Sequence, residues 1–264
     1  MPASHPFNFQ ANNMRNVHGL FLVGAWLACV GVAQAQALQA LTTEVPPMAF
    51  VRDGKLQGFC VDIVRKIQHR LGLSFPIAVM PWARAYQKAL VEPNTVLVCP
   101  KRTAEREKQF QWVGPLLSTH TGIYAKNGTI VKLASLDQAR RISSILVVRA
   151  SYSYQNLAGA GFHNLYEVND AASMVRMLMA DRAPAMMLER QELDEVLNAE
   201  GLSAQAFSAI FEMPSPTSNL AFSRDVPSQT VRQWQTAFAA MKKDGSYDKL
   251  RDKWFPAISH ARRR

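Results

Sequence analysis

The sequence predicts an α/β fold in which helices cover mostly parallel sheets on both faces. Short apolar runs of strand type alternate with stretches of helical periodicity along nearly the whole chain, an order typical of parallel sheets. Gly, Pro and Asp residues separate these segments, as expected of turns and helix ends. At 264 residues, the chain is long enough for one large domain or for two lobes that each bury a core.

Residues 1–37 are predicted to be a secretory signal peptide that is not part of the fold. An apolar run at 20–33 follows Arg15 and is shorter than the ~20 residues that cross a bilayer. Small residues alternate with Gln at 33–37, in the pattern that a signal peptidase cleaves. The alternatives are a lipoprotein acylated at Cys29 and a buried core helix. We therefore expect cleavage of the signal and a periplasmic protein.

The first set of elements lies between this segment and the Gly114-Pro115 pair. Asp53-Gly54 suits a tight turn and predicts a hairpin, and Gly72 suits the left-handed end of a helix. Apolar residues at strand or helical spacing define the other segments. In chain order, the set comprises a strand at 41–45, a hairpin at 50–56, a helix at 61–71, a strand at 75–80, a helix at 83–90 and a strand at 95–98.

The second set follows Gly114-Pro115. Ser135 and Gln138 resemble a capping box, and Ser151 and Asp170 suit helix N-caps. In chain order, the set comprises a short helix opening at 135, a strand at 142–148, a helix between 151 and 161, a strand at 165–168, a helix at 171–180, a strand at 185–188, a helix at 192–200 and a strand at 207–213.

The final segments predict a returning strand and two helices. The strand covers 219–223, and Pro227 stands near the start of a long helix. Asp244-Gly245 interrupts this helix, and a second helix continues over 247–254. Nothing later than the signal peptide is long and apolar enough to predict a membrane span.

The net charge of +10 does not by itself indicate a nucleic-acid partner. Basic residues are scattered along the chain, and the only dense run lies at 261–264. The sequence has no zinc-finger spacing, no aromatic RNA-binding pattern and no long basic helix. We interpret the charge as a solvated surface and expect no nucleic-acid partner.

The sequence also lacks the motifs of common catalytic sites. It contains no Gly-x-Ser-x-Gly, no His-Glu-x-x-His and no phosphate-binding loop, and its histidines after the signal peptide are isolated from one another. We therefore predict neither catalysis nor a metal site or cofactor. Two cysteines remain after residue 37, Cys60 and Cys99. An oxidising compartment permits a disulfide between them, but a pair of buried free thiols is the preferred interpretation.

Several short motifs stand in one order between 42 and 255. They are Pro46-Pro47, the run GKLQGF at 54–59 followed by Asp62, PWARA at 81–85, RTAER at 102–106, FQWVGP at 110–115, DGSY at 244–247 and KWF at 253–255. In these motifs the chain resembles family 3 of the extracellular solute-binding proteins, the ligand-binding subunits of amino-acid import transporters.

This resemblance implies a two-lobed periplasmic-binding-protein fold of type II. Lobe 1 would comprise 38–121 and 225–264, lobe 2 would comprise 127–218, and two crossing strands at 122–126 and 219–224 would form the hinge. The ligand of such a protein lies in the cleft at the carboxyl ends of the strands. The implied partners are a small-molecule ligand, either an amino acid or a related carboxylate, and an ABC permease in the inner membrane. A monomer is expected.

Arg106 is the foremost candidate for a ligand-binding residue. In the family that the chain resembles, the Arg of a Thr-x-x-Arg motif binds the ligand carboxylate, to which a guanidinium can donate two parallel hydrogen bonds. Ser151 is the candidate on the second lobe, although simple helix capping explains it equally well. The family usually has Gly before this Ser, whereas Ala150 stands here.

The remaining candidates depart from the family pattern. Glu189 follows a strand where the family often has an Asp that binds the ligand ammonium. The aromatic residues that flank Pro-Pro in many relatives are absent, so stacking on the ligand would fall to Trp82, Tyr152 or Tyr154. Further candidates are Arg84, which follows the same strand as Trp82, and Arg102, which would suit a ligand with more than one acidic group.

Two other functions fit the same resemblance. One is a binding protein that serves as the input of a membrane sensor. The other is an enzyme on the same fold, similar to the cyclohexadienyl dehydratases, in which Glu44 or Glu189 would act as the general acid.

Overall fold

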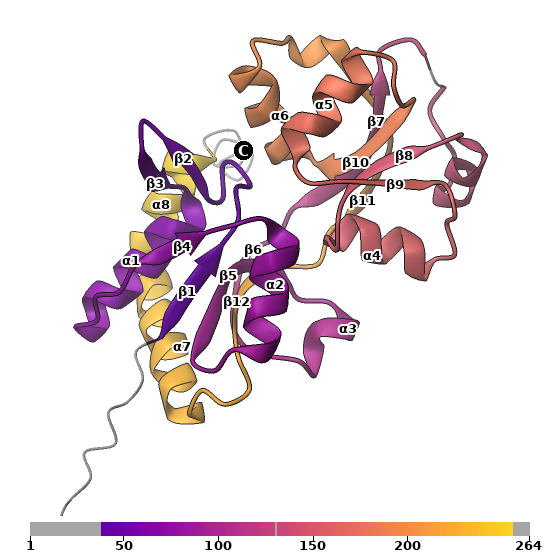
Figure 1. Ribbon diagram of the computed structural model, residues 1–264. Coiled ribbons are helices and arrows are strands. Elements are labelled where there is room, and N and C mark those ends of the chain that lie inside the picture. Colours follow the sequence, from indigo (N-terminus) through magenta and orange to yellow (C-terminus); the bar gives the residue numbers. More distant parts are fainter. Residues whose placement is uncertain (1–37, 130, 256–264) are drawn as a thin grey trace, which may run out of the picture. The chain divides into compact units, whose positions relative to one another are not determined.

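The first sheet of the computed structural model has the strand order β4-β1-β5-β12-β6 (Figure 1). The structure describes residues 38–129 and 131–255, so the predicted signal peptide, including Cys29, lies outside the described residues. The strands of this sheet are β1 (Gln39–Thr42), β4 (Ile77–Val79), β5 (Thr95–Lys101), β6 (Gln111–Leu117) and β12 (Ser218–Phe222).

The second sheet has the order β11-β7-β10-β8-β9. Its strands are β7 (His120–Lys126), β8 (Ile145–Val148), β9 (Leu165–Val168), β10 (Ala185–Glu189) and β11 (Phe207–Pro214). The predicted hairpin is present as a separate two-stranded sheet of β2 (Phe50–Arg52) and β3 (Lys55–Gln57).

Four of the five strands in each large sheet run in one direction, as predicted, and one strand in each sheet runs against them. β1 is parallel to β4 and β5, and β8 is parallel to β9 and β10. β12 is antiparallel to both of its neighbours, and so is β7. The reason is the path of the chain: β7 and β12 each enter their sheet directly from the other sheet, without the long crossover connection that sets a strand parallel to its neighbour.

Helices cover both faces of each sheet, as the sequence predicts (Figure 1). α1 and α7 pack on one face of the first sheet and α2 on the other, while α5 and α6 pack opposite α4 on the second sheet. The helices are α1 (Phe59–Leu71), α2 (Trp82–Val91), α3 (Ala104–Glu107), α4 (Tyr152–Gly159), α5 (Ala171–Met179), α6 (Arg190–Ala199), α7 (Ser228–Lys243) and α8 (Ser246–Trp254), with short 3-10 helices η1 (Leu136–Arg141) and η2 (Ala204–Ala206).

Alternate residues of the central strands belong to the cores on opposite faces. In β5, Val96 and Val98 pack toward α1 and α7, whereas Leu97 between them packs toward α2. In β10, Met186 and Met187 divide in the same way between the two cores of the second sheet. Burial on both faces explains why these strands are continuous apolar runs rather than alternating ones.

Local end signals place most helices where the sequence predicts them. Gly72 ends α1 in the left-handed region at φ 66°, and Asp170 caps α5 by accepting a hydrogen bond from the Ser173 N–H. The capping box at Ser135 is wrong, because this side chain makes no capping hydrogen bond. Gln138 instead accepts from the Ala134 N–H, and the segment forms the 3-10 helix η1.

The chain passes between the two sheets in two short segments. One follows β6 at 118–119, and the other precedes β12 at 215–217. A hydrogen bond of 3.0 Å from the Ser215 N–H to the Thr119 carbonyl joins the two segments. The ranges expected as hinge strands, 122–126 and 219–224, lie just beyond these passages, mostly within β7 and β12.

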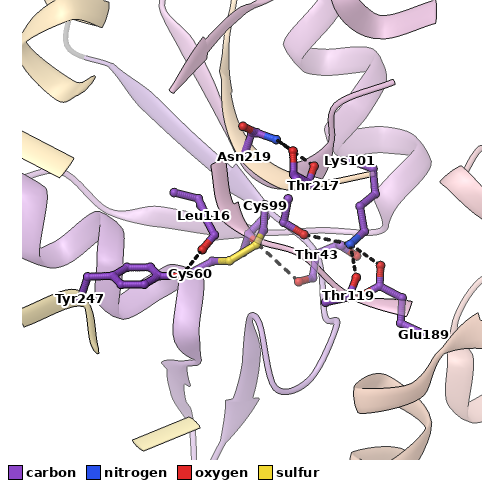
Figure 2. Close-up of a disulfide and its surroundings, with 12 residues drawn as sticks. Thr43, Cys60, Cys99, Lys101, Leu116, Thr119, Glu189, Thr217, Asn219 and Tyr247 are labelled. Carbon is purple, nitrogen blue, oxygen red and sulfur yellow. Dashed lines mark hydrogen bonds and ion pairs between the residues drawn. A yellow bond between two sulfur atoms is a disulfide. The ribbon is translucent and has the colours of Figure 1, made fainter. Parts of the chain in front are cut away.

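Cys60 and Cys99 form a disulfide that connects the first turn of α1 to β5 (Figure 2). The preferred interpretation as free thiols is therefore wrong. The two segments lie side by side in the core of the first sheet, which brings the Cα atoms to 6.0 Å, within the range that a disulfide spans. Within the described residues, no helix is both long and apolar enough to cross a membrane.

Candidate ligand-binding site

A cavity of about 120 Å³ lies where the carboxyl ends of parallel strands from both sheets meet. β1 and β5 of the first sheet lead into it, as do β8, β9 and β10 of the second. The polar and charged residues among its walls are Thr43, Glu44, Lys101, Arg106, Ser151, Tyr152, Ser153, Asn169, Asp170, Glu189, Glu192 and Ser218. This position agrees with the rule that open α/β sheets bind ligands beyond the carboxyl ends of their strands.

Arg106 lies at this cavity as a deeply buried cation. The Thr103 hydroxyl caps α3 by accepting from the Arg106 N–H, so the Thr-x-x-Arg spacing sets the helical turn that carries the guanidinium. Only 1% of the Arg106 residue is exposed. Its Nη1 donates to the Lys101 carbonyl at 3.2 Å and its Nη2 to the Ala150 carbonyl at 3.3 Å, whereas Nε has no hydrogen-bond partner among the described residues.

Aromatic rings enclose the same guanidinium. Its central carbon lies 5.0 Å from the ring centre of Trp82 and 5.0 Å from that of Tyr86, distances at which a cation is attracted to the ring face. Burial lowers the pKa of Arg106 from its usual range, and Tyr86 acts in the opposite direction. Among the described residues, no carboxylate forms an ion pair with Arg106. A buried cation without such a partner favours an anionic ligand.

Lys101 is a second buried cation at the cavity, and it was not among the residues predicted from the sequence. Its Nζ forms an ion pair with Oε1 of Glu189 at 2.5 Å and donates to the Thr119 hydroxyl at 2.7 Å (Figure 2). It also donates to the Ser218 hydroxyl at 3.0 Å. One signal was available, since Lys101 is a charged residue at the end of a buried strand, directly before the Arg-containing motif.

The acidic residues at the cavity differ in their surroundings. Glu189, at the end of β10, pairs with Lys101, and Glu192 follows it in the first turn of α6. Burial, and to a smaller extent the charge of Glu189, raise the pKa of Glu192 to about 8 against the opposing effect of Lys101. Glu44 is exposed, and so is Asp170, which caps α5. Glu192 therefore retains its proton at neutral pH.

Ser151 lines the cavity and also caps α4, accepting a hydrogen bond from the Tyr154 N–H at 3.2 Å. Ala150, just before it, has a φ of 54°, in the left-handed region where Gly is favoured. This conformation gives a physical reason for the Gly expected at position 150, and it aims the Ala150 carbonyl at Trp82 and Arg106.

The aromatic candidates divide between cavity and core. Trp82 and Tyr152 line the cavity, and the Trp82 ring stacks on Tyr86 at a centroid distance of 5.6 Å. Burial and the charge of Glu189 both raise the pKa of Tyr152. Tyr154 instead packs against the apolar cluster beneath α4 and is not among the lining residues.

Arg84 and Arg102 do not line the cavity. Arg84 is exposed on α2, since the apolar face of that helix is formed by Ala85 and Ala89. Arg102 forms a two-pronged ion pair with Glu107 at 2.6 and 2.7 Å, and both side chains are nearly half exposed. Lys101, rather than Arg102, brings the second positive charge to the site.

The described part of the chain shows no cluster of His, Cys, Asp and Glu residues suited to hold a metal ion. The site consists instead of two buried cations, one paired acid, one protonated acid and an aromatic wall. Such a set can bind a small polar molecule by charge and hydrogen bonding.

Comparison with solved structures confirms the two-lobed fold of periplasmic binding proteins. A histidine kinase sensor domain with similarity to such proteins matches with a TM-score of 0.76 at 17% identity, covering 83% of this chain and 96% of that one. An ancestral arginine-binding protein bound to arginine matches with a TM-score of 0.72 at 23% identity, covering 83% and 99%.

A third structure, the substrate-binding protein of an amino acid ABC transporter, matches with a TM-score of 0.70 at 21% identity, covering 83% of this chain and all of that one. At these identities the likeness shows the fold. None of the curated proteins matches the chain.

The family follows from the sequence itself. The model for bacterial extracellular solute-binding proteins, family 3, matches residues 39–257, which include both sheets and the whole cavity. The chain belongs to the bacterial extracellular solute-binding proteins, family 3.

Proposed function

We propose that this protein binds a small solute carrying a carboxylate, either an amino acid or a related acid, in the cavity between its two sheets. The observation that carries this proposal is Arg106, a guanidinium that is 1% exposed, lines the cavity and has no carboxylate partner among the described residues. Burying a cation in this way is costly unless an anion balances it. A planar carboxylate matches the donor geometry of a guanidinium.

Binding is proposed to close two lobes around the solute. Lobe 1 would comprise 38–121 and 225–264, and lobe 2 would comprise 127–218. Arg106 and Trp82 would contact the solute from lobe 1, while Ser151 and Tyr152 would contact it from lobe 2. A ligand that touches both lobes stabilises the closed arrangement over the open one, and the two passages between the sheets are short enough to act as the hinge.

The proposed location is the periplasm, reached by cleavage of a signal peptide within 1–37. The proposed partner is an ABC permease of the inner membrane, to which the closed monomer delivers its solute. Two of the structural neighbours support this proposal, since one binds arginine and another serves an amino acid ABC transporter. A membrane sensor is the alternative partner, supported by the sensor-domain neighbour. Permease and ATPase genes beside this gene would favour transport.

A thermal-shift screen of purified protein lacking 1–37 tests the proposed binding. The panel consists of the amino acids of proteins, each paired with its counterpart that lacks the α-ammonium. A solute at about 100 times its Kd should add roughly 2.7 kcal/mol to the free energy of unfolding, which a melting curve resolves. Titration calorimetry of each hit then gives its Kd. A folded, ligand-free protein that responds to no member of the panel would contradict the proposal.

Acid catalysis on a small carboxylate is a second candidate function, and Glu192 is the observation that favours it. Its carboxyl keeps a proton up to about pH 8 and faces the cavity, as a general acid must. In this role Glu192 would replace Glu44 and Glu189 as the predicted acid. Incubation with prephenate and with arogenate tests it: turnover that is lost in Glu192→Gln would support catalysis, and no turnover would exclude this reaction.

A further inference from the structure

Lys101 has no hydrogen-bonding capacity left for a ligand. An ammonium has three N–H donors, and the Nζ of Lys101 lies within 3.0 Å of three side-chain oxygens, those of Glu189, Thr119 and Ser218. The residue is only 8% exposed, so water does not compete for these positions. These contacts connect β5 and β12 of the first sheet, the passage at 119 and β10 of the second sheet.

Because of this arrangement, the acid that would pair with a ligand ammonium is already paired with Lys101. Glu189 is the acid at the end of β10, and its charge is already balanced by Lys101 at 2.5 Å. The next acid along the chain, Glu192, is held in its neutral form by burial and by the charge of Glu189. A free ammonium entering this part of the cavity would be desolvated, and the described residues around it offer no unpaired carboxylate to receive it, which is costly.

The other acids at the cavity lie in more open surroundings. Asp170 accepts hydrogen bonds from the backbone and the hydroxyl of Ser173, and Glu44 is exposed. Their charges are screened by solvent, so they offset less of the cost of desolvating a ligand ammonium. Among the described residues that line the cavity, Arg106 is therefore the buried charge without an ion-pair partner, and the enclosed part of the site favours a ligand of net negative charge.

We propose that Lys101 is a specificity-determining residue, a built-in cation that stands where a ligand ammonium would otherwise pair with Glu189. The preferred solute is then a carboxylate without an α-ammonium, held by Arg106 through its acid group. This inference rests on the proposed function and narrows its ligand class from amino acids and related acids to the acids that lack the amine.

Matched pairs of solutes test the inference directly. L-leucine with isocaproate, L-glutamate with glutarate, and L-phenylalanine with hydrocinnamate each share a carboxylate and a chain but differ in the α-ammonium. Calorimetric Kd values of the wild-type protein should favour the member without the amine by about 30-fold, the lower end of the effect of an unpaired buried charge. A wild-type preference for the amino acids would overturn the inference while leaving the proposed function intact.

Two variants then test whether Lys101 acts on the ligand preference through Glu189. Lys101→Met frees Glu189 and should shift the preference toward the amino acids by roughly 30-fold or more. The double variant Lys101→Met with Glu189→Gln removes both charges and should abolish that shift. Lys108→Met, at an exposed position nearby, is the matched control and should leave the preference of the wild type unchanged. A shift that persists in the double variant would show that Lys101 does not act through Glu189.

Glu189→Gln supplies a further test that does not require Lys101→Met to fold. With its acid removed, Lys101 becomes an unpaired cation, so glutarate, with two carboxylates, should gain about tenfold over isocaproate, with one. Circular dichroism and melting curves verify that each variant is folded. An unchanged ratio would contradict the role of Lys101, whereas failure of the wild type to bind any member of the panel would contradict the proposed function as well.

Discussion

Trp82 and Arg106 donate hydrogen bonds to the same acceptor, the carbonyl oxygen of Ala150. The distances are 2.7 Å from Trp82 Nε1 and 3.3 Å from Arg106 Nη2. Both donors belong to the elements around the first sheet, whereas Ala150 follows β8 of the second. The backbone between β8 and α4 thus meets the aromatic and cationic wall of the cavity, and its conformation affects the geometry of both.

We expect Arg106→Gln to weaken solute binding by roughly 2–5 kcal/mol, the usual effect of truncating one partner of a buried charge pair. Arg102→Gln is the matched control, since Arg102 lies outside the cavity and pairs with Glu107 at the surface. Titration calorimetry with the best hit of the solute panel gives the two Kd values. Equal losses in both variants would show that Arg106 has no special role.

Ala150→Gly should stabilise the protein by roughly 0.5–1 kcal/mol. The left-handed backbone at φ 54° is strained for Ala, and the relief outweighs the greater conformational entropy that Gly loses on folding. Ala239→Gly, at an exposed position inside α7, is the control and should lose about 1 kcal/mol. Denaturant unfolding measures both changes. A loss of stability in Ala150→Gly would contradict the explanation by strain.

Glu192→Gln should change how the stability depends on pH. The pKa of Glu192 rises from 4.5 to about 8 on folding, so folding takes up a proton between these values. The free energy of unfolding of the wild type therefore falls as the pH rises from about 4.5 to about 8. The whole of this loss persists at higher pH. The Gln variant lacks this contribution and should become the more stable protein at high pH. Melting temperatures of both proteins between about pH 4 and about pH 9, which extends beyond both ends of that window, measure the difference.

Parallel curves for the two proteins across that range would show that the Glu192 carboxyl is ionised in the folded state. Glu195→Gln, one turn further along α6 and partly exposed, is a suitable control. Its curve should follow that of the wild type.

The Cys60–Cys99 disulfide should account for a substantial part of the stability. The cysteines are separated by 39 residues in sequence, and closing a loop of this length removes roughly 4 kcal/mol of chain entropy from the unfolded state. Reductant should lower the melting temperature of the protein lacking 1–37 and have no effect on a Cys60→Ala, Cys99→Ala double variant. Thiol titration of unfolded, unreduced protein should find no free thiol. Two titrated thiols would refute the bridge.

The sequence predicts the elements well because their signals are local. The strand at 165–168 agrees in both ends with β9, and the caps at Ser151 and Asp170 are confirmed because a short polar side chain before a helix satisfies the first free N–H groups. The antiparallel strands β7 and β12 were not predicted, since their direction depends on which sheet the preceding strand belongs to. No local pattern encodes that relationship.

Only some of the residues at the cavity were predicted, because local sequence signals identify some of them and the packing of whole elements decides the others. Arg106 belongs to a motif whose Thr cap fixes its direction, so the sequence identifies it. Lys101 and Arg102 are neighbours in sequence with opposite surroundings, and only the register of β5 decides that Lys101 is buried while Arg102 is exposed. Arg84 faces solvent because of the helical phase of α2 against its sheet.

Cys99 is both one half of the disulfide and part of the cavity wall. The wall therefore acquires its final covalent form only after oxidation, which an oxidising compartment permits. Recombinant protein produced in a reducing cytosol would present a thiol on that surface. Its affinity for a solute would then be that of the reduced protein. The redox state of Cys99 thus affects both the stability of the fold and the surface of the cavity.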